Sequence, residues 1–104
     1  MKVLNHSVTE SRTMLEKDIE KKLVAWCLTK GWECLKLRLD GQNGFPDRTI
    51  IAPHGICFIE LKRPGGKLRA RQRVWLDKLN SMGHLAFCSD SLNDMKGRLT
   101  TWAS

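Results

Sequence analysis

Apolar residues recur at intervals of three and four positions in three parts of the chain, and this period predicts three helices. The first helix spans residues 14–30 and ends at Gly31, and the second spans 69–82 and ends at Gly83. The third helix begins after Ser91. The predicted buried faces are formed by Leu15, Ile19, Leu23, Trp26 and Cys27, by Trp75, Leu76, Leu79 and Met82, and by Leu92, Met95, Leu99 and Trp102.

Short runs rich in β-branched, aromatic and other apolar residues predict four strands between these helices. A Pro53-His54-Gly55 connection joins two of them as a hairpin. The order is helix, three strands, helix, strand, helix, which predicts an α/β (α+β) fold with helices packed on a small mixed sheet. The predicted strands cover residues 32–39, 49–52, 56–62 and 84–88.

The length of 104 residues suits one compact domain, which we assign to residues 14–104. Residues 1–13 show no usable period, and we expect a flexible arm or a strand tied to a partner. The four cysteines lack paired spacing, so free thiols in a reducing cytosol are expected rather than a zinc site. Neither a secretory signal nor a membrane-spanning run is visible, which predicts a soluble cytoplasmic protein.

The charge distribution suggests a polyanionic partner. Eighteen Lys and Arg against eleven Asp and Glu give a formal charge of +7, which is high for so small a domain. The alternative is a generally basic, well-solvated surface. Many of the cations are concentrated after residue 62, where clustered positive charge suits contacts with a phosphate backbone. The residues predicted to contact nucleic acid are Arg48, Arg63, Lys67, Arg69 and Arg71.

The candidate chemistry lies in the predicted hairpin. Glu60 and Lys62 are two residues apart on a strand, so their side chains share one face of an otherwise apolar run. The hairpin brings the end of this strand back toward Asp47, which follows Pro46 at the start of the preceding strand. Two carboxylates beside a lysine form a hard-oxygen site suited to Mg²⁺ or Mn²⁺. The alternative is a solvated Glu60–Lys62 ion pair at the strand end.

Pro46-Asp47 followed by Glu60-Leu61-Lys62 has the form of the PD-(D/E)xK nuclease signature. The wider block from Gly44 to Gln72, with its Phe-Ile-Glu-Leu-Lys and Pro-Gly-Gly-Lys-Leu segments, resembles the VRR-NUC family of virus-type replication and repair nucleases. The resemblance implies a restriction-endonuclease-like core. It also implies Asp47, Glu60 and the Leu61 backbone carbonyl as metal ligands, with Lys62 as the catalytic lysine.

The resemblance also implies a glutamate on the first helix as a further catalytic and metal-binding residue. Glu20 matches best, eleven residues before Gly31, and Glu16 is a rival one turn earlier. A helix acid favoured by the helix dipole is the alternative. Gln72 falls in line with the apolar face of the second helix, where a polar group needs a partner. It either bonds to backbone in the first turn of the helix or reaches into the active site.

These observations together predict a metal-dependent endonuclease acting on DNA. The resemblance implies a Holliday-junction or branched-DNA substrate, a homodimer, a role in DNA repair and a phage or bacterial setting. One predicted site per chain also requires a second copy if both strands are to be cut. The rival prediction is a non-catalytic nucleic-acid-binding module that keeps only the basic segment. A structural or regulatory phage protein that binds another protein is a third possibility.

Overall fold

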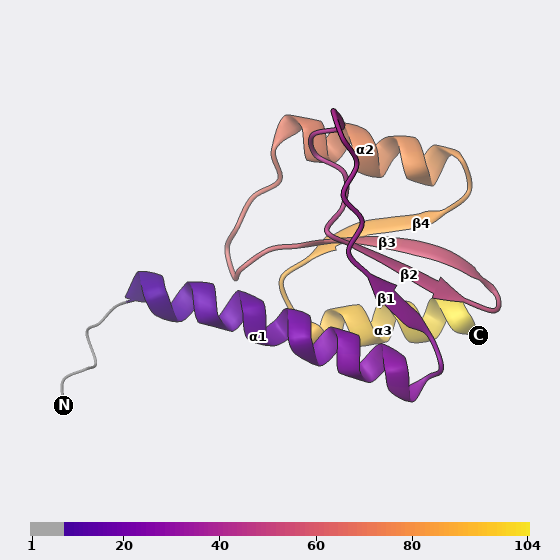
Figure 1. Cartoon of the computed structure of the whole chain (residues 1–104), viewed down its shortest axis with the longest axis horizontal. Helices are drawn as coiled ribbons and strands as arrows, with labels where there is room; N and C mark the ends of the chain where they lie inside the picture. Colours follow the sequence, from indigo (N-terminus) through magenta and orange to yellow (C-terminus); the bar gives the residue numbers. More distant parts are fainter. Residues whose placement is uncertain (1–7) are drawn as a thin grey trace.

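The computed structural model describes residues 8–104, and side chains from residue 16 onward. A four-stranded sheet lies between helices on both of its faces (Figure 1). The elements along the chain are α1 (Val8–Thr29), β1 (Glu33–Leu35), β2 (Arg48–Ala52), β3 (Gly55–Leu61), α2 (Ala70–Ser81), β4 (Leu85–Ser89) and α3 (Leu92–Ala103). Among the described residues, no helix combines the length and the apolarity that crossing a membrane requires.

The strands are arranged in the order in which they occur in the sequence. The pairs β1–β2 and β2–β3 are antiparallel, whereas β3 and β4 are parallel and connected through α2. The sheet is therefore mixed, as the sequence predicted. In the β2–β3 hairpin Arg48 pairs with Ile59. Extending this register by one residue places Asp47 opposite Glu60, on the same face of the sheet.

Two clusters of buried apolar residues hold the layers together. On one face, α1 and α3 bury Leu23, Cys27, Met95 and Leu99 against residues of the sheet such as Ile59. On the other face, α2 covers β3 and β4 through a smaller cluster formed by Leu76, Leu79, Phe58 and Ala86. The larger core thus lies between the sheet and the helices α1 and α3, and the smaller core lies between the sheet and α2. The face under α2 also carries Glu60.

Two predicted boundaries and one predicted core residue were wrong. The first helix begins at Val8 rather than at residue 14, because its opening turns contain no helix breaker although they lack an apolar stripe. Strand β1 is only three residues long, since within residues 8–104 it pairs with the short β2 alone and the leucines that follow are exposed. Met82 is 64% exposed because it caps α2 instead of continuing its buried face. The rest of the predicted arm, residues 1–7, lies outside the described residues.

Candidate active site

The segment before Asp47 is anchored from two directions. Gly44 has φ +88°, and a Cβ there would lie 2.8 Å from backbone atoms of Arg71 in α2, so only glycine allows this approach. The Phe45 ring makes edge contacts with Phe58 of β3 and Trp75 of α2, at centroid distances of 5.7 and 5.0 Å. These contacts hold the chain in place where it enters β2.

The structure brings Asp47, Glu60 and Lys62 together at the end of the hairpin. Asp47 Oδ2 accepts a hydrogen bond from the backbone N–H of Leu61 at 3.0 Å. Glu60 is only 4% exposed, and Lys62 Nζ lies 3.8 Å from Glu60 Oε2. The pKa of Glu60 is raised to about 8, mainly by burial and secondly by the nearby Asp47 carboxylate. The Lys62 ammonium opposes this shift. The Glu60–Lys62 pair is therefore largely buried rather than solvated.

Gln72 fulfils both of the roles considered for it. Its Oε1 accepts a hydrogen bond from the backbone N–H of Arg69 at 2.8 Å, which closes the first turn of α2. Its Nε2 donates to Glu60 Oε2 at 2.9 Å. One amide side chain thus satisfies the helix terminus and orients a buried carboxylate, which connects α2 directly to the candidate site.

Glu20 lies in a different set of contacts. Its Oε2 accepts a hydrogen bond from Arg48 Nε at 2.8 Å and lies 3.7 Å from Lys36 Nζ. Arg48 Nη1 also donates to the backbone carbonyl of Cys34 at 3.3 Å. The side chains of Arg48 and Glu20 are only 17% and 19% exposed. The guanidinium predicted to contact nucleic acid therefore points into the protein, toward α1 and β1.

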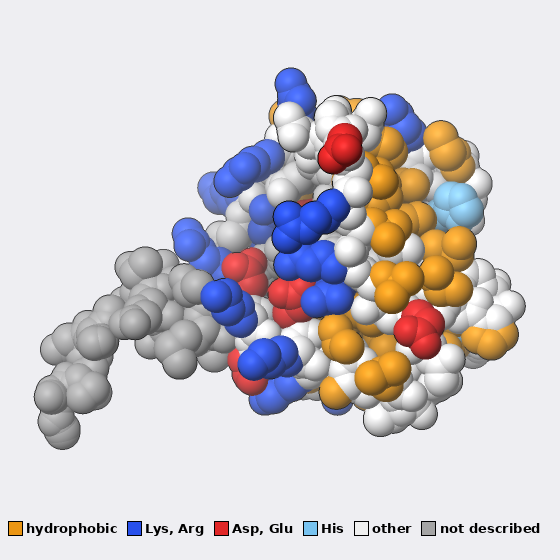
Figure 2. Space-filling model, viewed as in Figure 1, with side chains coloured by type: hydrophobic (Ala, Val, Ile, Leu, Met, Phe, Trp, Pro, Cys, Tyr) orange, Lys and Arg blue, Asp and Glu red, His pale blue; other side chains and the backbone are white. Residues whose placement is uncertain are grey.

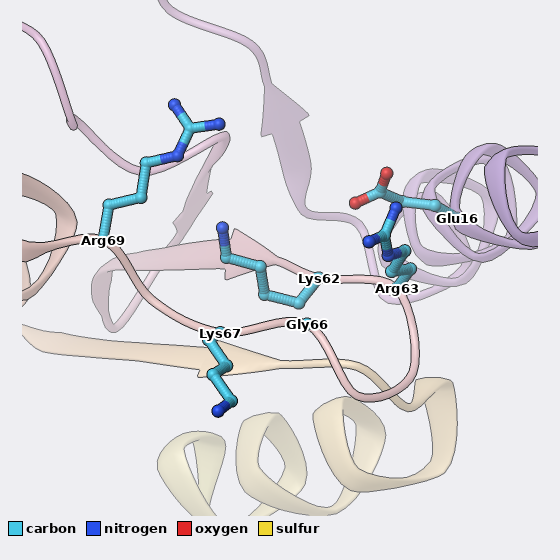
Figure 3. A pocket seen from close by; sticks show the side chains of 6 residues that line it. All are labelled: Glu16, Lys62, Arg63, Gly66, Lys67 and Arg69. Carbon is cyan, nitrogen blue, oxygen red and sulfur yellow. The ribbon is translucent and has the colours of Figure 1, made fainter. Parts of the chain in front are cut away.

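A basic pocket of about 290 Å³ lies beside Lys62. Figure 3 shows Glu16 reaching this pocket from α1, near Arg63, while Lys62 and Arg69 extend to the same side of their segment in this view. In Figure 2 many of the Lys and Arg side chains gather around a few acidic ones, and apolar side chains occupy another part of the same face. The pocket is lined by Glu16, Lys62, Arg63, Gly66, Lys67 and Arg69.

The structure adds two details to the surroundings of the basic pocket. Arg71 lines a separate hollow with residues 41–43, Val74 and Trp75, so it does not share the pocket beside Lys62. Asp90, which was not predicted to matter, accepts a hydrogen bond from the Gly65 N–H at 3.3 Å and ties the basic loop to the end of β4. No local motif could have indicated a contact between residues 25 positions apart.

The donor set at Asp47 and Glu60 suits a divalent cation. Within residues 8–104, as far as their side chains are described, no three His, Cys, Asp or Glu side chains form a cluster that could hold a metal ion. Mg²⁺, however, is commonly bound by only one or two carboxylates, together with water and substrate phosphates. Placing a second carboxylate beside the buried Glu60 is costly unless one of the two is protonated or a cation neutralises them. The site therefore fits a metal that is completed by substrate.

Comparison with solved structures gives a match that bears on the fold. No protein-family model matches the chain, and no curated protein matches it. A solved structure described as "VRR_NUC domain" superposes with a TM-score of 0.75 and 24% sequence identity, covering 83% of this chain and 95% of that one. This similarity confirms the predicted fold, a mixed four-stranded sheet with flanking helices.

Proposed function

We propose that this chain, whose fold is that of a VRR_NUC domain, is a divalent-metal-dependent DNA endonuclease that hydrolyses phosphodiester bonds. The observation that carries the proposal is the convergence of Asp47 and Glu60 beside Lys62, which lines a basic pocket. Both carboxylates and the Leu61 carbonyl are the proposed ligands for Mg²⁺ or Mn²⁺. When bound there, the cation would activate a water molecule and polarise the scissile phosphate.

The residues around this pair have distinct proposed roles. The Lys62 ammonium, held near Glu60, balances the negative charge that develops on the phosphate and orients the attacking water. Gln72 keeps the Glu60 carboxylate in one orientation through the hydrogen bond from its amide. Arg63, Lys67 and Arg69 neutralise backbone phosphates of the bound DNA in the adjoining pocket.

The substrate and assembly are finer parts of the same proposal. The described residues contain no helix with the features of a base-reading element, so we propose recognition of DNA shape, as in branched or Holliday-junction DNA. One site cuts one strand, and a homodimer would present two sites to two strands. We place the protein in the cytoplasm of a bacterial or phage-infected cell, in DNA repair or replication.

The test is cleavage of labelled four-way junction, flap and duplex DNA in EDTA, Mg²⁺ or Mn²⁺. Wild type, Lys62→Ala and the control Lys30→Ala are compared; Lys30 is an exposed lysine that follows α1. We expect metal-dependent nicking that Lys62→Ala abolishes and Lys30→Ala preserves. Salt-sensitive DNA binding without cleavage in any metal would contradict catalysis and support the non-catalytic binding module.

A further inference from the structure

The contact between Glu20 and Arg48 adds a part of the site that neither the fold nor the proposed ligands explain. Arg48 directly follows Asp47 in the chain, and its guanidinium bonds to α1 through Glu20 and to β1 through the Cys34 carbonyl. Three elements thus meet at one side chain, immediately beside a proposed metal ligand. Both side chains are mostly buried, so the pair is shielded from solvent screening.

The same contacts argue against Glu20 as a metal ligand. Its Oε2 already contacts two cations, Arg48 at 2.8 Å and Lys36 at 3.7 Å. Where side chains are described, Glu20 does not join Asp47 and Glu60 in any cluster of three potential ligands. Of the two acids considered on α1, Glu16 is the one that lines the pocket with Lys62.

The Asp47 carboxylate itself makes one hydrogen bond, so the contacts of Arg48 add a restraint on the backbone immediately next to it. Asp47 precedes the first residue of β2, so the regular ladder of the hairpin begins only at Arg48. Its carboxylate is held by the Leu61 N–H. A free Arg48 side chain would leave the start of β2 attached to the sheet on one side only, since β1 pairs with β2 no further than Thr49.

We propose that Arg48 and Glu20 form a positioning pair that fixes Asp47 beside Glu60, and that Glu20 acts through Arg48 rather than on the metal. This inference refines the proposed nuclease site and rests on it for its biological meaning. The physical claim, that the pair restrains the Asp47 carboxylate, concerns the protein alone and is testable without metal or DNA.

Two adjacent amides provide a matched measurement of this restraint. The Leu61 N–H bonds to the Asp47 carboxylate, whereas the Lys62 N–H bonds to the Ser89 carbonyl at 3.0 Å. Amide hydrogen exchange is followed by NMR in metal-free wild type, Arg48→Met and Arg98→Met. Arg98→Met is the control, because it breaks the exposed Arg98–Asp94 pair on α3. We expect roughly tenfold faster exchange at Leu61 in Arg48→Met, with Lys62 unchanged.

The outcomes separate a positioning role from general support of the fold. Equally faster amide exchange at Leu61 and Lys62 would indicate a general loosening of the fold. Unchanged exchange at Leu61 would show that Arg48 does not restrain Asp47. Either result overturns the proposal. If the wild type proves to be catalytically inert, the nuclease proposal fails while the exchange pattern still decides this one.

A second variant tests the role of Glu20 directly. Glu20→Gln keeps the size of the side chain and an oxygen that can accept the Arg48 hydrogen bond. Mn²⁺ affinity is measured by calorimetry for wild type, Glu20→Gln and Asp47→Asn. We expect Glu20→Gln to stay within about threefold of wild type while Asp47→Asn loses at least about tenfold. A loss in Glu20→Gln equal to that in Asp47→Asn would make Glu20 a ligand and overturn this assignment.

Discussion

Two acid–base pairs lie near the start of β2, and they differ in contact distance, in burial and in their neighbouring groups. Glu20 and Arg48 are in direct contact at 2.8 Å, and Arg48 has a further acceptor in the Cys34 carbonyl. Glu60 and Lys62 are separated by 3.8 Å, and Glu60 is almost completely buried next to a second carboxylate. The first pair is satisfied within the protein. In the second, one lysine faces two carboxylates, and the buried one retains its proton near neutral pH.

This difference shows how a small domain can use similar residues for opposite purposes. A tight, mostly buried pair with additional hydrogen bonds restrains the elements that it connects. A loose pair beside a second carboxylate gains from an added cation, because a cation removes the repulsion that burial intensifies. In the proposed nuclease, the tight pair supports the geometry of the site and the loose pair takes part in the chemistry.

The largest expected effect comes from removing the cation of the loose pair. Lys62→Met keeps the length and apolar stem of the side chain but removes the ammonium that faces Glu60. We expect metal-dependent cleavage to fall by about a thousandfold, since a preorganised charge at the reacting phosphate is lost. Initial rates on the preferred substrate measure this. A loss of less than about tenfold would remove Lys62 from the catalytic machinery.

The next effect concerns the stability of the metal-free protein. The folded-state pKa of Glu60 is raised to about 8 from an ordinary value of 4.5, so the folded protein keeps a proton that the unfolded chain has lost. The free energy of unfolding should therefore decrease as pH rises from about 4.5 through 8. Glu60→Gln cannot ionise and should avoid this decrease.

In EDTA we compare the free energy of unfolding of Glu60→Gln with that of wild type at two pH values. We expect this difference to shift in favour of Glu60→Gln by about 2 kcal/mol between pH 5 and pH 8.5. Urea unfolding at the two pH values measures this change, and adding Mg²⁺ should reduce the advantage by stabilising the wild type. A difference between the two proteins that does not vary with pH would contradict the account of Glu60.

A smaller effect is expected where α2 contacts the loose pair. Gln72→Leu removes the hydrogen bond to Glu60 and the bond that closes the first turn of α2. We expect about tenfold slower cleavage and a loss of about 1 kcal/mol in the free energy of unfolding. Gln42→Leu, at an exposed loop glutamine, is the matched control and should change neither quantity. Unchanged cleavage by Gln72→Leu would limit Gln72 to capping the helix.

The smallest expected effect lies in the basic pocket. Arg69→Gln removes one pocket cation, and we expect about threefold weaker DNA binding at moderate salt, with a salt-dependence slope lower by about one. Lys30→Gln removes one exposed lysine that does not line this pocket and should leave the slope unchanged. Fluorescence anisotropy across a salt series measures both. Equal slopes for the two variants would mean that the pocket holds no phosphate.

The success of the sequence prediction depended on how far apart the contacting residues are. Asp47 and Glu60 were expected to meet because a hairpin with a short connection has a narrow range of registers, and the observed register agrees. The overall fold followed from helical and strand periods and was confirmed. The Arg48–Glu20 contact joins residues 28 positions apart on different elements. No local sequence pattern predicts which acidic side chain an arginine will contact over such a separation.

The periodicity of apolar residues also did not predict how exposed individual side chains are. Met82 matched the helical period of α2, yet it lies at the cap, where the buried face has already ended. Leu35 belonged to an alternating segment, but in β1 only the central Cys34 is buried and Leu35 is 37% exposed. A period identifies which residues share a face, whereas tertiary packing decides whether that face is covered.

The most direct test of the central claim is the protonation change that accompanies Mn²⁺ binding. Mn²⁺ is titrated calorimetrically at pH 7 in two buffers with different ionisation enthalpies, using wild type, Glu60→Gln and Asp47→Asn. If the pKa of Glu60 is raised next to Asp47 and both carboxylates bind the ion, wild type should release nearly one proton per ion bound. Glu60→Gln should release none, and Asp47→Asn should bind much more weakly. Tight binding by Asp47→Asn, or binding by wild type without proton release, would contradict the claim that Asp47 and Glu60 together form the cation site.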